Sequence, residues 1–181
     1  MNSRLAKRYA RAIIELAREA NALEPWGNEL GRAAAAFSEP RLQPILLSPA
    51  IDGKVRRRTT RAVADALGLP PMVRNLILLL ADRDRLGLLS DVARWYEQLL
   101  DEAVGRARVT IRSAVGLAAP EKTTLVELAK RLTRSREVVA NAEVDPELLG
   151  GVVLDVGGTV YDGSVRNQLA RLGKEMAEDG A

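Results

Sequence analysis

Carboxylates that could take part in chemistry flank a glycine-rich stretch near the carboxyl end. Asp155 and Asp162 lie on either side of Gly157-Gly158, and Gly150-Gly151 precedes them. Glycine pairs can cradle a phosphate, and paired carboxylates can act as general acid and base. The chain has neither a G-x-G-x-x-G run nor a Gly-Lys-Ser/Thr ending here. We therefore interpret the glycines as turns and predict no catalytic residue at either aspartate.

The residue types that the chain lacks restrict its chemistry further. Its 181 residues include no Cys and no His. Disulfides, thiolate nucleophiles, the usual zinc sites and the commonest general base are therefore excluded. We predict a protein that is not an enzyme by itself and that has no catalytic residue, no metal and no cofactor.

A dense basic run is the other stretch that could bind a charged ligand. Lys54 to Arg61 reads Lys-Val-Arg-Arg-Arg-Thr-Thr-Arg, and such runs can bind phosphate backbones. No aromatic residue is interleaved for base stacking, and Asp65 lies four residues beyond Arg61 for a helix-surface pair. The pattern favours a solvated helix face. An RNA-binding helical bundle that uses this run, like some transcription factors, stays open as an alternative function.

The composition predicts a folded, soluble chain. Hydrophobic residues make up 47% and charged residues 28%, so a packed core is available, but aromatics are only 3% and that core must be Ala, Leu and Val. The longest apolar run, Leu76 to Ala81, is far short of the roughly 20 residues of a membrane-spanning helix. Glu15 and Glu19 argue against a transit peptide, so the amino end reads as a first structural helix.

Helical periodicity and breakers predict six helices before Gly105. They cover Leu5 to Ala20, the stretch from Pro25 through Phe37, a short piece from Arg41 to Leu47, Asp52 to Leu67, Met72 to Arg83, and a last helix with Ser90 as its N-cap. Short breaks join them, which is typical of a bundle. We expect residues 1–105 to form an N-terminal six-helix bundle.

After Gly105 the pattern changes to a mixture of strands and helices. Residues 106–113 alternate with period two, which predicts a strand, and Pro120 opens a helix with Leu125, Leu128, Ala129 and Leu132 facing inward. Gly157-Gly158 then joins two extended runs as a β-hairpin, and Ser164 is expected to cap a closing helix. The predicted fold class is α+β, mostly α, with a small mixed α/β domain over residues 106–181.

Two helices carry apolar surfaces that could be core or docking faces. The apolar residues between Leu5 and Ala20 spread over about 200°, about twice what one core contact uses. Burial from two sides and an exposed docking face both remain open. On the closing helix, Val165, Leu169, Leu172 and Met176 form a stripe bordered by Arg166, Arg171 and Lys174. Two interpretations of this stripe stay open: a surface that binds a partner helix, and a cover for the small sheet. The two are compatible with one another.

Several motifs, in order along the whole chain, together resemble one family. They are Val-Asp-Pro-x-Leu-Leu-Gly-Gly-Val-Val at 144–153, Asp-Gly-Ser-Val at 162–165, Arg8-Tyr9-Ala10, Asn75-Leu76, Arg83-x-Arg85-Leu86, Tyr96 and Ala107-Arg108-Val109. In their order and spacing they resemble the delta subunit of F-type ATP synthases, the family of the mitochondrial oligomycin-sensitivity-conferring protein. Two departures are Gly116, where the family often has Pro, and Gly158-Thr159, where it often has a charged hairpin tip.

The resemblance implies a non-catalytic stator subunit of a proton-translocating ATP synthase. Residues 1–105 would bind the alpha (and beta) subunits of the catalytic head, and residues 106–181 would bind the b subunits of the peripheral stalk. The chain would resist the torque of the rotor, with no nucleic acid as partner and no membrane span of its own. It would lie peripherally at the cytoplasmic face of the bacterial plasma membrane.

The resemblance, with the excess apolar surface of two helices, also implies interface residues. Those expected at the alpha-subunit interface are Ala6, Tyr9, Ala10, Ile13, Ile14, Ala17, Leu76, Ile77 and Leu80. Those expected at the b-subunit interface are Val165, Arg166, Leu169, Leu172 and Met176.

Overall fold

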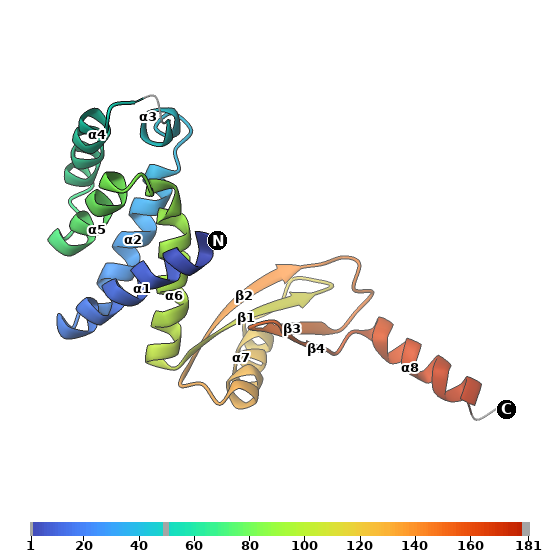
Figure 1. The fold of residues 1–181 in the computed structure, drawn as a ribbon. Coiled ribbons are helices and arrows are strands. Elements are labelled where there is room, and N and C mark those ends of the chain that lie inside the picture. Colours follow the sequence, from blue (N-terminus) through green and yellow to red (C-terminus); the bar gives the residue numbers. More distant parts are fainter. Residues whose placement is uncertain (1, 49–50, 179–181) are drawn as a thin grey trace. The chain divides into compact units, whose positions relative to one another are not determined.

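The computed structural model describes residues 2–48 and 51–178, and it forms two compact units that divide between Leu100 and Asp101 (Figure 1). The predicted α+β class, mostly helical with a small mixed sheet, is confirmed. The division precedes Gly105, because the last turn of a long helix packs with the second unit.

The first unit is helical throughout its described residues. Its elements are α1 (Asn2–Glu19), α2 (Leu23–Phe37), α3 (Gln43–Leu47), α4 (Gly53–Ala66), α5 (Pro71–Asp82), the 3-10 turn η1 (Leu86–Leu88) and α6 (Leu89–Val104), which runs on past Leu100. Pro71 occupies the first turn of α5, where a missing N–H costs nothing. The expected N-cap at Ser90 is wrong, because η1 leads directly into α6 and the Ser90 hydroxyl instead lies 3.1 Å from that of Ser38.

The core of the first unit is built around α5. This helix contacts α1, α2 and α4, and Leu76, Ile77 and Leu80 are all buried. Small residues on the facing helices, Ala10 on α1 and Ala33 on α2, are also fully buried and let the helices approach closely. The apolar run of α5 is therefore explained by burial within the unit.

A buried tyrosine ties α6 to the start of α2. The Tyr96 hydroxyl donates a hydrogen bond of 2.7 Å to the carbonyl of Leu23. The ring packs against Gly27, where an added Cβ would lie 3.1 Å from a ring carbon. Burial raises the pKa of Tyr96 to about 12. The phenol is thus held neutral, and its one donor is satisfied by a backbone acceptor.

Removing this hydroxyl should destabilise the first unit. We expect Tyr96→Phe to lower the free energy of unfolding by about 1–2 kcal/mol, because the Leu23 carbonyl loses its donor in a partly buried setting. Native Tyr96 keeps its proton at a pH where an unfolded tyrosine releases it, so the advantage of wild type over Tyr96→Phe should shrink as the pH rises above about 10. Urea unfolding followed by circular dichroism measures both effects. Tyr9→Phe, which removes only an exposed bond to Arg85, is the control, and equal stability of Tyr96→Phe and wild type would refute the prediction.

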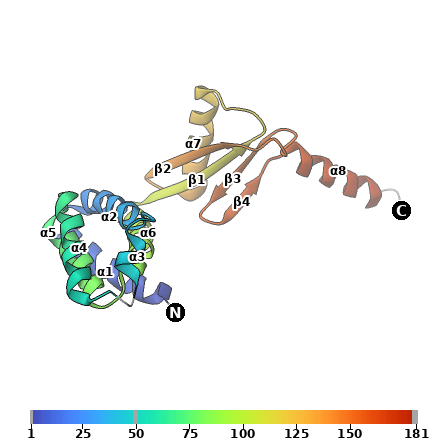
Figure 2. The same ribbon diagram turned by 90° about the horizontal axis from the view of Figure 1, so that it is seen from above.

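The second unit is a four-stranded sheet with one helix against it. Its strands are β1 (Arg106–Ser113), β2 (Glu137–Val144), β3 (Val152–Val156) and β4 (Thr159–Asp162), in the order β2-β1-β3-β4. β1 pairs with β2 in parallel and with β3 antiparallel. Because parallel neighbours need a crossover, α7 (Ala119–Thr133) joins β1 to β2 and covers one face of the sheet (Figure 2).

The core of this unit lies between α7 and the sheet. Val109, Ile111, Leu154 and Ala129 are its buried centre, and Leu125 packs against them. The expectation that Leu128 and Leu132 also face inward is wrong, since both side chains are exposed. One narrow stripe of α7 is enough to cover a sheet this small.

The predicted hairpin and closing helix are both present. Gly157 and Gly158 have φ of +57° and +92° and join β3 to β4. Ser164 caps α8 (Val165–Glu178), because its hydroxyl accepts a hydrogen bond of 3.2 Å from the backbone N–H of Asn167. Local turn chemistry therefore sets the position where α8 begins.

Candidate interaction surfaces

The two aspartates near the glycine pairs serve the backbone. Asp155 accepts a hydrogen bond of 3.0 Å from the N–H of Gly158 in the hairpin turn, and Asp162 accepts one of 2.8 Å from the N–H of Ser164. Hydrogen bonds from Ser164 hold the pKa of Asp162 below its usual value, and Arg112 adds to this. Within the described residues no three acidic side chains gather as a metal site. The arrangement explains both carboxylates as turn and cap residues.

Two arginines of the basic run on α4 form ion pairs within the first unit. Arg56 is buried, donates to the carbonyls of Ser48 and Ile51, and forms an ion pair with Asp84. Arg57 forms an ion pair of 2.5 Å with Asp82. Two of the five cations of the run, Arg56 and Arg57, are therefore paired with carboxylates of the first unit. The RNA-binding alternative is left without support.

The expected helix-surface pair of Arg61 with Asp65 is wrong. Asp65 instead forms an ion pair of 3.0 Å with Arg74 at the start of α5. The carboxylate of Asp65 therefore links α4 to α5 through Arg74.

No helix within the described residues has the length and apolar character of a membrane span.

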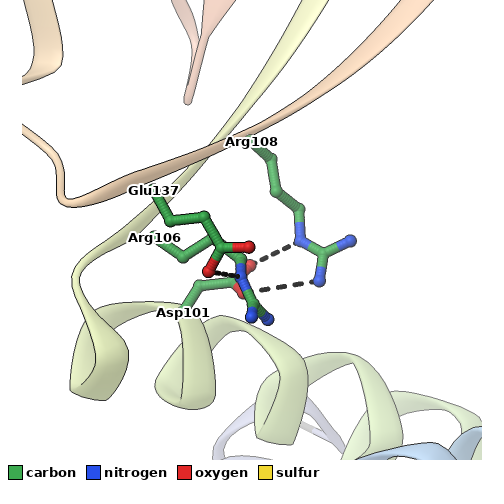
Figure 3. A network of polar contacts seen from close by, with 4 residues as sticks. All are labelled: Asp101, Arg106, Arg108 and Glu137. Carbon is green, nitrogen blue, oxygen red and sulfur yellow. Dashed lines mark hydrogen bonds and ion pairs between the residues drawn. The ribbon is translucent and has the colours of Figure 1, made fainter. Parts of the chain in front are cut away.

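A polar network fastens the last turn of α6 to the first residues of the sheet (Figure 3). Asp101 is buried, and it accepts a hydrogen bond of 2.5 Å from Arg108 Nε and lies 3.7 Å from Arg106 Nη1. Arg106 also donates to Glu137 on β2 over 3.0 Å. One carboxylate thus meets two guanidinium groups from β1, and the network joins the last turn of α6 to β1 and β2.

Loss of this carboxylate should loosen the sheet. We expect Asp101→Ala to destabilise the second unit by about 1–3 kcal/mol, because two strand arginines lose a buried acceptor. Hydrogen exchange of the β1 and β2 amides measures this. Asp91→Ala is the control on the same helix, since its pair with Arg94 is exposed and worth at most about 0.5 kcal/mol. Equal protection in the two variants would contradict a clamping role.

Most of the residues expected at the alpha-subunit interface are buried within the first unit. They are Ala6, Ala10, Ile13, Ile14, Ala17, Leu76, Ile77 and Leu80, and only Tyr9 is partly exposed. The wide apolar arc of α1 is therefore split: one side belongs to the core, and the other carries Leu5, Tyr9, Ala12 and Leu16. These four follow the spacing i, i+4, i+7, i+11 and form a continuous stripe on the helix.

This stripe borders a hollow on the surface of the first unit. The hollow has a volume of about 250 Å³ and is lined by Leu5, Arg8, Tyr9, Ala12 and Arg85. We call it the α1 groove. On α5, Met72 (45% exposed) and Leu79 (43%) are apolar side chains that the core leaves exposed, as is Leu16 (41%) on α1.

The apolar stripe of α8 begins at a fixed anchor and then leaves the sheet. The N–H of Val165 donates to the carbonyl of Gly150 over 3.0 Å, so the first turn is held to the loop before β3. Beyond it Leu169 is 58% exposed and Arg166 is exposed, and α8 extends away from the strands (Figure 1). Leu169 therefore does not cover the sheet. The side chains of Leu172 and Met176 lie outside the described residues.

Comparison with known proteins identifies the family. Residues 5–176 match the family model of the ATP synthase delta (OSCP) subunit. A relative from Geobacter sp. (strain M21), "ATP synthase subunit delta", is 37% identical over 171 residues, 93% of each chain. This chain belongs to the ATP synthase delta (OSCP) subunit family. Another delta subunit, from Anaeromyxobacter dehalogenans (strain 2CP-1), is 38% identical over 175 residues, 96% of this chain and 97% of that one.

The fold of the delta family chain is also seen in a solved structure. A chain of the Toxoplasma gondii mitochondrial ATP synthase hexamer matches it with a TM-score of 0.67 at 20% identity, covering 96% of this chain and 97% of that chain. The resemblance read from the motifs is thus confirmed at the level of family and fold.

Sequence reasoning missed the exposed side chains of this delta family member. The sequence pattern does not distinguish exposed Leu16 from its buried neighbours on α1, and it does not distinguish exposed Leu79 from the rest of its apolar run. Arg85 lies in a family motif, and its sequence neighbours indicate no role for it. A helical wheel of α1 groups Leu5, Tyr9, Ala12 and Leu16 on one side of the helix. The wheel does not show which side of α1 faces the core.

Proposed function

We propose that this chain is the non-catalytic stator subunit of a bacterial F-type ATP synthase, linking the catalytic head to the peripheral stalk. The observation that carries this is the match of nearly the whole chain, residues 5–176, to the ATP synthase delta (OSCP) family. The subunit would associate peripherally with the cytoplasmic face of the plasma membrane through its partners. Its task needs two persistent interfaces and no turnover.

The first unit would bind the amino-terminal segment of an alpha subunit. Ala10 and Ile77 are buried, so they would position the interface from within the core without touching the partner. The partner would contact the α1 stripe of Leu5, Tyr9, Ala12 and Leu16, which is at least partly exposed. Met72 and Leu79 on α5 add apolar area. An amphipathic helix laid along such a stripe buries its own apolar residues at matching spacing.

The second unit would bind the b subunits through α8. Leu169 presents an exposed apolar side chain, and Val165 continues the stripe at the anchored end. Exposed Arg166 beside the stripe would fix the register of a charged partner helix. Apolar area would supply most of the affinity.

Reconstitution tests the proposed function. Membranes that hold the proton channel and the b subunits, but are depleted of this chain and of the catalytic head, should regain ATP-driven proton pumping only when head and chain are added together. The isolated chain should hydrolyse no ATP. Full pumping with the head alone would contradict a stator role.

A further inference from the structure

The α1 groove combines an apolar floor with a cationic rim. Leu5 and Ala12 supply apolar lining, and Arg8 and Arg85 supply two guanidinium groups. The described lining residues include no carboxylate. Arg85 Nη1 donates a hydrogen bond of 3.0 Å to the Tyr9 hydroxyl. This bond holds one cation at the groove, since the acceptor is itself fixed on α1.

The two rim cations differ from several other arginines of the first unit, which form ion pairs with carboxylates. Arg32, Arg57 and Arg74 each lie within 3.0 Å of a carboxylate, as their ion pairs show. Within residues 2–48 and 51–178, neither Arg8 nor Arg85 forms an ion pair. A partner seated on the apolar floor would partly desolvate both charges, which is unfavourable unless it brings a counter-charge.

We infer that the α1 groove recognises an amphipathic helix that carries a carboxylate, with Arg8 and Arg85 as the specificity-determining residues. The inference rests on the proposed function and adds the chemistry of the bound segment. The stripe from Leu5 to Leu16 extends for about 16 Å, three helical turns, which suits a helix rather than a single charged group. The apolar floor favours a peptide over a nucleic acid, because the phosphates of a nucleic acid would contact only Arg8 and Arg85 and would leave the floor uncovered.

The charge of the peptide is the variable to test. The probe is a synthetic, fluorescently labelled peptide with the amino-terminal sequence of the alpha subunit from the same organism, and a second peptide has its Asp and Glu changed to Asn and Gln. Binding to the full-length chain is followed by fluorescence anisotropy. We expect the neutralised peptide to bind about tenfold to a hundredfold more weakly, because charge-assisted hydrogen bonds are lost. High salt should reduce this difference.

Variants of the rim locate the effect. Arg8→Gln and Arg85→Gln should each shrink the difference between the two peptides while leaving the neutral peptide's affinity nearly unchanged. Arg58→Gln is the matched control, since Arg58 is exposed on α4 away from the hollow. Circular dichroism checks that each variant is folded. The effect of each rim variant is measured as a change in the ratio of affinities for the two peptides. A variant that merely lost its fold would bind both peptides more weakly, so it would not give the expected result.

Three results would overturn the inference. If both peptides bind wild type equally, or if the alpha segment has no Asp or Glu, the groove does not read a carboxylate, while the proposed function still stands. If neither peptide binds at all, the assignment of this unit to the catalytic head fails as well. If an RNA oligonucleotide displaces the peptide and Arg8→Gln abolishes that displacement, the groove is a nucleic-acid site instead.

Discussion

Replacing Gly151 with alanine should disrupt the second unit where α8 is attached to it. Gly151 has a φ of +81°, and a Cβ at this position would lie 2.4 Å from the carbonyl oxygen of Gly163. The nearby atoms belong to the backbone of Gly163 and Ser164, and the Gly163 N–H is bonded to the Val152 carbonyl, which restrains this segment. We expect Gly151→Ala to cost about 2–4 kcal/mol through strain and overpacking.

Thermal unfolding and hydrogen exchange of the β3 amides measure this loss. Gly116→Ala is the matched control, because an added Cβ there meets nothing within 4 Å. The Gly151 variant should also bind a soluble b-subunit fragment more weakly, since the start of α8 shifts with the loop. Stability equal to that of Gly116→Ala would show that the close approach at Gly151 is not required.

Replacing Leu169 with aspartate should abolish stalk binding and leave folding intact. Leu169 is exposed, so its replacement removes no core contact. In a complex the same side chain would lie in an apolar seam, where an unpaired carboxylate costs several kcal/mol, about a hundredfold or more in affinity.

Calorimetry with the soluble b fragment measures the affinity. Asn167→Asp adds the same charge on another side of α8 and should bind within a fewfold of wild type. If Leu169→Asp binds as tightly as Asn167→Asp, the stalk does not dock on this stripe, and the assignment of α8 is wrong.

The elements that could be predicted from the sequence are those with local signals. Gly157-Gly158 specifies a tight hairpin because both residues adopt positive φ, and Ser164 caps the next helix with its own hydroxyl. The pairing of β1 with β2 could not be predicted in the same way. The pairing places Arg106 opposite Glu137, and the whole of α7 lies between these two residues in the sequence. The stretch from Glu137 to Val144 also has no clear alternation that marks it as a strand.

The interaction surfaces were harder to predict than the fold. Apolar residues of α1 and α5 serve both core and surface, and periodicity alone does not say which side of a helix meets its neighbours. Ala10 and Leu16 belong to the same predicted arc, yet one is fully buried and the other exposed. Ion pairs such as Arg56 with Asp84 depend likewise on contacts between helices that are distant in sequence.

The measurement that tests the account most directly is simultaneous binding of both partners to one chain. Native mass spectrometry of the full-length chain with the alpha-subunit peptide and the soluble b fragment should show a ternary complex. Leu169→Asp should remove only the b fragment from it. If the two partners exclude one another, or if Leu169→Asp releases the peptide while the b fragment stays bound, the chain does not link head to stalk in the way proposed.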